Sequence, residues 1–228
     1  MTGSTYVGGL AGYSSNTINN ASALNRVEGV SGTGANTVYY GVKGVNQVGG
    51  FIGNLYNTTL SVSKADTVVL GTGSDIGGFV GRMEYGAVNT SGTLGTVIGV
   101  GSTGGFAGSM INNASVTTSY ANANVSSSGS NVGGFVGHFN TTGNVTNSRA
   151  AGSVTGVSYV GGFAGYVNNT GGISVSYATG SVTASGDAAG GFIGYANNNY
   201  AASKRTISDF YATGAVTGTT NVGGLIGY

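Results

Sequence analysis

Apolar and small polar residues alternate over short stretches of the chain, which is the pattern of half-buried β-strands. The stretch from Ile173 to Thr179, Ile-Ser-Val-Ser-Tyr-Ala-Thr, shows this alternation clearly. No segment repeats apolar residues at the helical period over the length of a helix. Gly, Asn, Thr and Ser are frequent where a helix would favour Ala, Leu, Glu and Lys. The pattern therefore predicts an all-β protein built from short strands.

A hexapeptide of the form apolar-Gly-Gly-aromatic/Leu-small apolar-Gly recurs eight times. The copies begin near residues 7, 48, 76, 103, 132, 160, 189 and 222. Five of the seven intervals between copies lie within one residue of about 28. Such a fixed period is typical of repeat architectures, so residues 1–228 are predicted to form a single repeat domain.

Other positions keep the same period. The twelfth residue after the first glycine of a copy is apolar at Val116, Val145 and Ile173, and the twenty-first is apolar at Leu70, Ile98, Val125, Val154 and Val182. The sixteenth is Tyr120, Tyr177, Arg149 or Thr93. Two intervals are longer, and we expect their insertions near residues 33–45, where 37–43 has a strand-like sequence, and near 197–205, just before Ile207.

Each unit is predicted to contain three short strands, with Asn/Gly clusters at the corners, where positive φ angles are needed. One such unit cannot bury its own apolar face, whereas units stacked along an axis can. We therefore predict a parallel β-solenoid, or β-helix, of about eight coils with about 28 residues per coil. Right-handed coils are expected, because parallel crossovers are usually right-handed. A β-propeller is disfavoured, since its blades need about 40–50 residues each.

The residue that follows each pair of glycines is expected to point into the solenoid. The glycines would let the wall pass close to a neighbouring wall or ring, where a β-carbon would be crowded. Apolar residues fall on both alternation faces of the hexapeptide, so spacing alone leaves two solutions: two packed layers, or a bulge at the glycine pair. The predicted column consists of Leu10, Phe51, Phe79, Phe106, Phe135, Phe163, Phe192 and Leu225.

Composition narrows the function. The chain has 47 Gly, no Pro, Cys or Trp, and only 7 basic and 6 acidic residues, for a net charge of +1. This balance disfavours nucleic-acid binding. The apolar runs are too short for membrane insertion. Without Cys there is no thiolate metal site or thiol nucleophile. The start of the chain lacks the basic and apolar regions of a signal peptide.

The repeat resembles a known motif. Val-Gly-Gly-Phe-Val/Ala-Gly, followed by Ile/Val-x-x-Ser-Tyr-Ala-Thr-Gly-Ser-Val-Thr-Gly, is similar to the GLUG motif, most clearly at residues 161–183 and 191–227. That motif occurs in bacterial cell-surface proteins, including filamentous-haemagglutinin-like adhesins and streptococcal IgA-cleaving metallopeptidases. The resemblance implies a secreted, surface-attached scaffold and no catalytic residue. The chain departs from the motif at Arg149, Thr103 and Ala189, and in its first three units.

Candidate catalytic and metal-binding residues are few. His138 is the only His, at a variable position that we expect to be exposed. Asp75 and Asp187 occupy similar positions four coils apart, roughly 19 Å at the spacing of paired strands. That is too far for the paired carboxylates of a glycoside hydrolase. Residues 71–75 match part of a calcium-binding nonapeptide once, where consecutive copies are needed. We therefore predict no catalytic residue, cofactor or metal.

Two sets of surface residues are candidates for contact. One lies in the expected insertions: Tyr39, Tyr40, Lys204 and Arg205. The other follows the last glycine of four hexapeptides, at Tyr13, Tyr166, Tyr195 and Tyr228. Tyrosines at an edge can stack on sugars or proteins, although a ladder of half-buried structural rings is the favoured interpretation.

The sequence thus predicts a non-catalytic structural or adhesive scaffold outside the cell, on a bacterial surface. Its partner would be a host or bacterial glycan or protein. The hexapeptides start close to Tyr6 and end at Tyr228, so we expect a segment of a longer protein or a subunit that stacks end to end on copies of itself. A self-assembling filament is therefore the first alternative, and a polysaccharide-binding or polysaccharide-degrading β-helix is the second.

Overall fold

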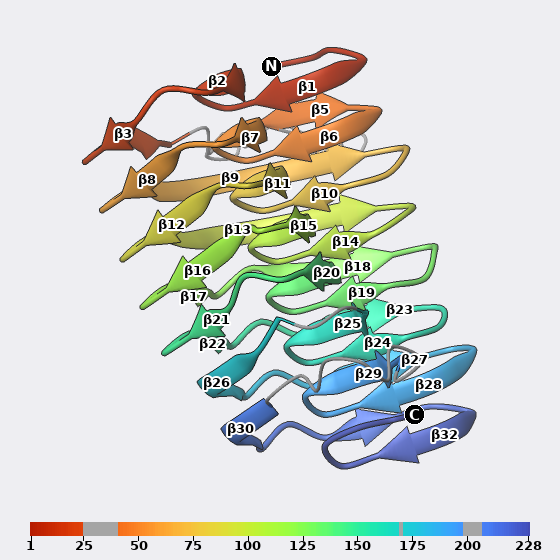
Figure 1. Ribbon diagram of the computed structural model, residues 1–228. Helices are drawn as coiled ribbons and strands as arrows, with labels where there is room; N and C mark the ends of the chain where they lie inside the picture. The colour runs from red at the N-terminus through yellow and green to blue at the C-terminus, as the bar shows by residue number, and fades with distance from the viewer. Residues whose placement is uncertain (25–40, 169–170, 198–206) are drawn as a thin grey trace, which may run out of the picture.

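The computed structural model describes residues 1–24, 41–168, 171–197 and 207–228. It is a parallel β-solenoid, in which successive turns stack along one axis and each strand pairs in parallel with its counterpart in the next turn. The N-terminal and C-terminal turns lie at opposite ends of the stack (Figure 1). The predicted fold class is therefore confirmed.

Three sheets form the walls of the solenoid. Sheet 1 contains the first glycine of each hexapeptide and comprises β1 (Thr5–Gly8), β6 (Asn46–Gly49), β10 (Ile76–Gly77), β14 (Thr103–Gly104), β19 (Val132–Gly133), β24 (Val160–Gly161), β28 (Asp187–Gly190) and β32 (Thr220–Gly223). Sheet 2 follows the glycine pair and comprises β2 (Ala11–Ser14), β7 (Ile52–Tyr56), β11 (Val80–Glu84), β15 (Ala107–Asn112), β20 (Val136–Thr141), β25 (Ala164–Val167) and β29 (Ile193–Ala196).

Sheet 3 closes each turn and contains seventeen strands. They are β3 (Ile18–Asn19), β4 (Ser22–Ala23), β5 (Val42–Gly44), β8 (Thr59–Ser61), β9 (Lys64–Gly71), β12 (Ala87–Asn89), β13 (Gly92–Gly99), β16 (Ser115–Thr117), β17 (Tyr120–Ala121), β18 (Asn124–Ser127), β21 (Val145–Thr146), β22 (Arg149–Ala150), β23 (Val154–Gly156), β26 (Ile173–Ala178), β27 (Val182–Ala184), β30 (Ile207–Ala212) and β31 (Val216–Thr217).

The first glycines of all eight hexapeptides pair with one another across sheet 1, from Gly8 to Gly223, and the intervals between Gly49 and Gly190 keep the regular period. The protein has about 5 turns with about 28 residues per turn, slightly fewer than the expected eight coils. The turns on either side of this region contain the two long intervals, which is why counting hexapeptides overestimates the number of regular coils. Handedness stays a prediction.

Corners recur at fixed places in each turn, and many carry a non-glycine residue with positive φ. Such angles are uncommon for residues with a β-carbon, so their recurrence shows that the path of the coil demands them. One column of them lies at the start of sheet 1, in its strands or directly before them: Tyr6, Gln47, Asp75, Asn131, Tyr159, Ala188 and Asn221. A second lies within sheet 3: Asn20, Val62, Thr90, Thr118, Asn147, Val175 and Asp209.

Two hydrophobic cores fill the solenoid. One contains the phenylalanines and the inward residues of sheet 2, such as Ile52, and the other contains the valines of sheet 1, such as Val48. Sheets 1 and 2 meet without side chains between them: a β-carbon on Gly49 would lie 1.9 Å from the carbonyl oxygen of Ile52. Of the two solutions left open by spacing, two packed layers is therefore correct.

The predicted phenylalanine column is confirmed. The rings of its six members, Phe51 to Phe192, are fully buried. Neighbouring ring centroids lie 4.7–4.9 Å apart with interplanar angles from 2° to 24°. The prediction is wrong for its two ends, because Leu10 is 44% and Leu225 is 43% exposed. Both keep backbone hydrogen bonds to the column, but they lie in the outermost turns, which have a neighbouring turn on one side only.

The glycine pairs are as crowded as predicted. A β-carbon on Gly134 would lie 2.1 Å from the carbonyl oxygen of Gly162 in the next turn, which leaves no room for a side chain. At the last copy the equivalent position, Gly224, has no atom within 4 Å. The crowding is therefore a consequence of stacking and not of the local turn.

The register of sheet 3 corrects part of the predicted spacing. The apolar column contains Val69 and Val97 beside Val125, Val154 and Val182, so the choice of Leu70 and Ile98 was wrong by one residue. Likewise Gly92, not Thr93, pairs with Tyr120. The cause is a turn one residue longer after β15, because Glu84 pairs with Ile111 but Ala87 pairs with Ser115. The twelfth-residue column of Val116, Val145 and Ile173 is correct.

The two insertions are placed by the pairing on either side of them. Ala23 pairs with Ala65 and Val42 pairs with Val69, so the extra residues of the first interval lie between Ala23 and Val42. The predicted range 33–45 was wrong at its end, because β5 is part of the regular turn. Residues 37–40 lie outside the described part. The second insertion precedes Ile207 as predicted, since Ile207 pairs with Ile173.

A column of buried serines crosses the corner within sheet 3. Its members are Ser63, Ser91, Ser119, Ser148 and Ser176. Each hydroxyl donates to the carbonyl oxygen two residues earlier, at 2.8–3.0 Å. Each also accepts a hydrogen bond from a backbone N–H of the preceding turn, at 3.2–3.3 Å. These hydrogen bonds join successive turns at a point where the strand ladder is interrupted.

Candidate binding face

The contact residues predicted in the insertions, Tyr39, Tyr40, Lys204 and Arg205, all lie outside the described residues. The structure therefore gives them no position. The tyrosines predicted after the hexapeptides are described, and they lead to a face at the corner between sheets 1 and 2.

This corner face, as we call it, consists of the outward column of sheet 2, the positive-φ residues at the start of sheet 1, and two tyrosines at strand ends, Tyr56 on β7 and Tyr85 directly after β11. The core residues Ile52 and Leu55 lie on the same strand as Asn54 of this column. The column runs in register through Tyr13, Asn54, Arg82, Ser109, His138, Tyr166 and Tyr195, and Tyr228 stacks beyond Tyr195.

Residues seven apart meet across this corner. Asn54 donates a hydrogen bond from Nδ2 to Oε1 of Gln47 at 2.6 Å. One turn on, the Arg82 guanidinium lies 3.8 Å from the Asp75 carboxylate. The rings of Tyr6 and Tyr13, at the same spacing, have centroids 6.2 Å apart. Sheet 1 and sheet 2 each supply one member of every pair because the glycine pair folds one sheet directly onto the other.

Four tyrosines at the N-terminal end of the face form what we call the tyrosine strip: Tyr6, Tyr13, Tyr56 and Tyr85. Their exposed fractions are 47%, 50%, 38% and 49%. Successive ring centroids are 6.0–6.4 Å apart, and two of the three contacts are edge-to-face. Because only Tyr13 and Tyr56 are stacked, with centroids 6.4 Å apart, parts of the ring faces are open to solvent.

The C-terminal end of the face is built differently. Tyr166, Tyr195 and Tyr228 are stacked plane on plane, with centroids 4.9–5.2 Å apart and interplanar angles of 9° and 15°. Tyr159 packs against two of them, and Asn197 donates to the Tyr166 hydroxyl at 3.0 Å. Tyr166 and Tyr195 are half-buried, as the structural ladder predicted. The prediction is wrong for Tyr13 and Tyr228, which are 50% and 63% exposed.

The middle of the face is polar. Asn54 is 6% exposed, and its Oδ1 is buried with no hydrogen-bond partner among the described residues. Nε of Arg82 is also buried with no hydrogen-bond partner among the described residues. Burial raises the pKa of the Asp75 carboxyl, and the Arg82 charge opposes this effect by lowering it. On the neighbouring strand, Asn112 donates to Oε1 of Glu84 at 2.8 Å.

His138 lies in this column, between Ser109 and Tyr166. Its expected exposure was wrong, because the imidazole is half-buried, 5.4 Å from the Tyr166 ring. Burial lowers its pKa below the usual 6.5. Asn54 and Ser109, expected to be exposed with it, are buried. The packing of the corner covers them, which spacing alone did not indicate.

Asp75 and Asp187 have different partners and lie in different parts of the solenoid. Asp75 faces Arg82, while Asp187 accepts hydrogen bonds from Thr220 and Asn221 at 2.7 Å, and these lower its pKa. Within the described part of the chain, no group of three or more His, Asp or Glu residues could hold a metal ion. The described residues also contain no helix that could cross a membrane.

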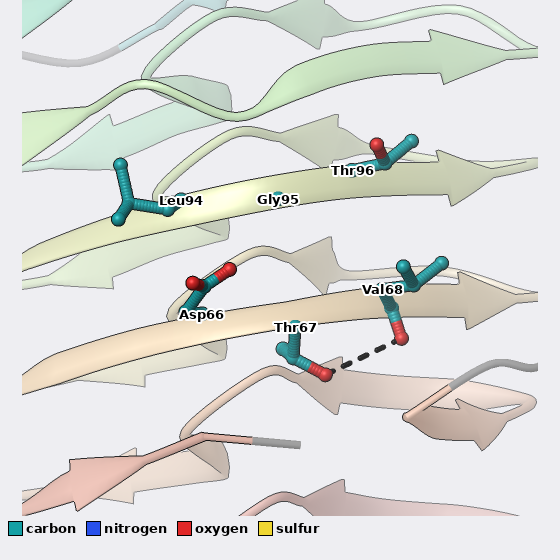
Figure 2. A pocket seen from close by; sticks show the side chains of 6 residues that line it. All are labelled: Asp66, Thr67, Val68, Leu94, Gly95 and Thr96. Carbon is teal, nitrogen blue, oxygen red and sulfur yellow. Dashed lines mark hydrogen bonds between the residues drawn. The ribbon is translucent and has the colours of Figure 1, made fainter. Parts of the chain in front are cut away.

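A hollow of about 420 Å³ lies on the outer face of sheet 3, over β9 and β13 (Figure 2). Gly95, which has a φ of +99°, contributes no side chain there and so opens the surface. Thr67 donates its hydroxyl to the carbonyl oxygen of Val68 at 3.5 Å. The lining is Asp66, Thr67, Val68, Leu94, Gly95 and Thr96. It has no aromatic ring, so the corner face is the stronger candidate for ligand binding.

The same sheet carries a further outward column. The Arg149 guanidinium carbon lies 5.0 Å from the centroid of the Tyr120 ring, a cation–π arrangement. Tyr177 and Tyr211 stack beyond it, with centroids 4.9 Å apart. These contacts tie neighbouring turns together on the outside, as the phenylalanine column does on the inside.

The sequence partly indicated the corner face. It gave Tyr13, Tyr166, Tyr195 and Tyr228 by their position after the hexapeptides, but it missed Tyr56 and Tyr85. The spacing of seven, as between Gln47 and Asn54 or between Asp75 and Arg82, shows that two sheets contribute to one surface and could have added Tyr6 beside Tyr13. It gives no signal for Tyr56 and Tyr85.

The fold defines this chain as a parallel β-solenoid with an aromatic and polar corner face. No family model matches it, and neither does any curated protein or solved structure in the comparisons made. Its function is therefore argued from its own residues.

Proposed function

We propose that this chain is a non-catalytic structural and adhesive scaffold of a bacterial cell-surface or extracellular protein. The observation that carries the proposal is the uninterrupted phenylalanine column from Phe51 to Phe192. The resemblance of the repeat to the GLUG motif supports the same function. A partner on the host or bacterial surface, a glycan or a protein, would bind to the outside of this column.

The column supports a scaffold because it makes the solenoid a continuous body. Each fully buried ring contributes about 1.5–3 kcal/mol of hydrophobic stabilisation. Parallel hydrogen bonds join every regular turn to the next on three sheets. In a repeat protein of this kind each turn contacts its neighbours, so the outer faces are held at fixed positions along the axis. A surface fixed in this way suits repeated weak contacts, whose avidity exceeds the affinity of any one contact.

An adhesion assay tests the proposal. Beads coated with the purified chain are allowed to settle on cultured epithelial cells and on bacterial cell walls, and the beads retained under flow are counted. We expect several-fold more retained beads than with beads coated with the Gly134→Ala variant, in which the stacking of turns is disrupted. Equal retention of the two kinds of bead on every surface would contradict an adhesive function.

Self-assembly into a filament is the second candidate function. The outermost turns expose apolar side chains at both ends of the described solenoid: Leu10 at one end, and Val222, Leu225 and Ile226, at 40–48% exposure, at the other. Both ends also present unpaired parallel strands, which can pair with another chain. Polymers of uniform diameter are expected by electron microscopy at micromolar concentration. A monomer at all concentrations in sedimentation would exclude this function.

A further inference from the structure

We infer that the tyrosine strip, together with Gln47, Asn54 and Arg82, is a binding site for a neutral polysaccharide chain. The inference rests on the proposed adhesive function, for which it names the ligand and the site. Its observations are the open geometry of four tyrosine rings, two buried polar atoms without partners, and the balance of charge around them.

The ring geometry distinguishes the strip from the other tyrosines of the corner face. In the strip, two of three contacts are edge-to-face, and every ring is at least 38% exposed. A pyranose ring packs its C–H face on such an aromatic surface, while the phenol hydroxyl bonds to its hydroxyl groups. The stacked rings of Tyr166 and Tyr195 cover each other's faces and present only edges. The strip is therefore the part of the face that can receive sugar rings.

Asn54 lies among the rings of the strip. It pairs in register with Tyr13 and precedes Tyr56 by two residues on the same strand, β7. Its Oδ1 is an acceptor without a partner, and Nε of Arg82, its neighbour in register, is a donor without a partner. A sugar hydroxyl both donates and accepts, so it can bond to both atoms. Gln47 is only half-buried, and its outward rotation would open the path to them.

The charges favour a neutral ligand. The Arg82 and Asp75 side chains face each other at 3.8 Å, and Glu84 accepts a hydrogen bond from Asn112. The site therefore has no surplus of positive charge that would select an acidic polysaccharide or a phosphate. It gives an acidic peptide no electrostatic advantage either, because Asp75 and Glu84 outnumber Arg82.

The shape favours a chain and not a single sugar. The strip crosses the parallel strands β2, β7 and β11, which lie about 4.8 Å apart. Its length along the axis is thus about 10 Å between the outer strands, with room for two or three consecutive sugar rings. An extended ligand would lie along the solenoid axis, where each turn contributes at least one tyrosine.

Binding to immobilised polysaccharides tests the inference. The probes are neutral β-glucan, mannan, galactan and chitin, with hyaluronan and heparin as anionic probes and collagen as a protein probe. We expect retention on at least one neutral polysaccharide and a loss of at least tenfold in affinity when Tyr13→Ala and Tyr56→Ala are combined. The matched control is Tyr211→Ala, because Tyr211 is 51% exposed and Tyr13 is 50% exposed, on different sheets. The control should bind like the parent chain.

Asn54→Asp provides a second variant that keeps the size of the side chain and converts the amide into a carboxylate. We expect Asn54→Asp to bind more weakly than the parent chain. We expect the tyrosine variants to show the same thermal unfolding as the parent chain. Three results would each overturn the inference. They are retention on anionic or protein probes alone, no retention on any neutral polysaccharide, and equal affinity of the double variant and the parent. If double-variant beads still adhere to cells, the proposed adhesive function stands and this site is wrong. If the chain binds a neutral polysaccharide but its beads do not adhere, the proposed function is wrong and the site stands.

Discussion

The backbone N–H of Ser119 donates a hydrogen bond to the hydroxyl oxygen of Ser148, which lies one turn further along the solenoid, at 3.2 Å. Ser148 in turn donates to the carbonyl oxygen of Thr146 in its own turn. One hydroxyl thus satisfies an N–H that the neighbouring strand cannot reach. Both serines are 2% exposed, so water cannot replace them.

Ser119→Ala is expected to lower the free energy of unfolding by about 1–3 kcal/mol, because the N–H of Ser91 loses its buried acceptor. Urea unfolding followed by circular dichroism measures the change. Ser126→Ala is the matched control, since Ser126 is exposed on β18, and it should change stability by about 0.5 kcal/mol or less. Equal effects of the two substitutions would show that the serine column does not stabilise the corner.

Gly134→Ala is expected to destabilise the chain by about 3 kcal/mol or more, because the new β-carbon would lie 2.1 Å from a backbone oxygen that cannot move independently. Gly224→Ala introduces the same methyl group at the same place in the repeat, where nothing lies within 4 Å. It should therefore be nearly neutral. Thermal unfolding of both variants measures the two losses of stability. A similar loss of stability in both would mean that the turn, and not the stacking, requires glycine.

Phe135→Ala is expected to cost about 3–5 kcal/mol, as for other large aromatic side chains removed from a core. Phe135 is fully buried between Phe106 and Phe163. Leu225→Ala, at the equivalent but 43% exposed position, should cost much less. Unfolding in guanidinium measures the free energy of unfolding of both variants. A small effect at Phe135 would mean that the column contributes little to stability.

Lowering the pH is expected to destabilise the chain through His138. Burial lowers the pKa of its imidazole below 6.5, so the folded chain binds the proton less readily than the unfolded chain. The free energy of unfolding should therefore fall as the pH drops through about 6.5, and level off below the folded pKa. His138→Gln should remove this part of the pH dependence. The same slope in the variant would assign it to another group.

Much of the fold could be predicted because the repeat forces equivalent residues to pair. The phenylalanine column followed directly from the position after the glycine pair. Its ends could not be predicted, because the burial of Leu10 and Leu225 depends on a turn beyond them and not on their own surroundings. The shift at Leu70 and Ile98 arose from a single extra residue after β15, which the hexapeptide spacing averages out.

The corner face was less accessible to sequence reasoning. Its strip combines Tyr6 from sheet 1 with Tyr56 and Tyr85, which lie outside the hexapeptide and have no tyrosine counterpart in the neighbouring turns. The buried serines recur at almost the same spacing as the phenylalanines and could have been found. They were overlooked because a serine in an Asn- and Thr-rich chain resembles the exposed residues around it.

The register across the sheets has a consequence for how the molecule can change in length. Residues 132–159 make up one period of 28 residues, and their paired members on all three sheets have counterparts 28 residues later. Duplicating that segment would give each new residue the same kind of neighbours in the adjacent turns. It would lengthen the solenoid along its axis by about 4.8 Å. The length of the solenoid can therefore change one turn at a time without redesign of its interior.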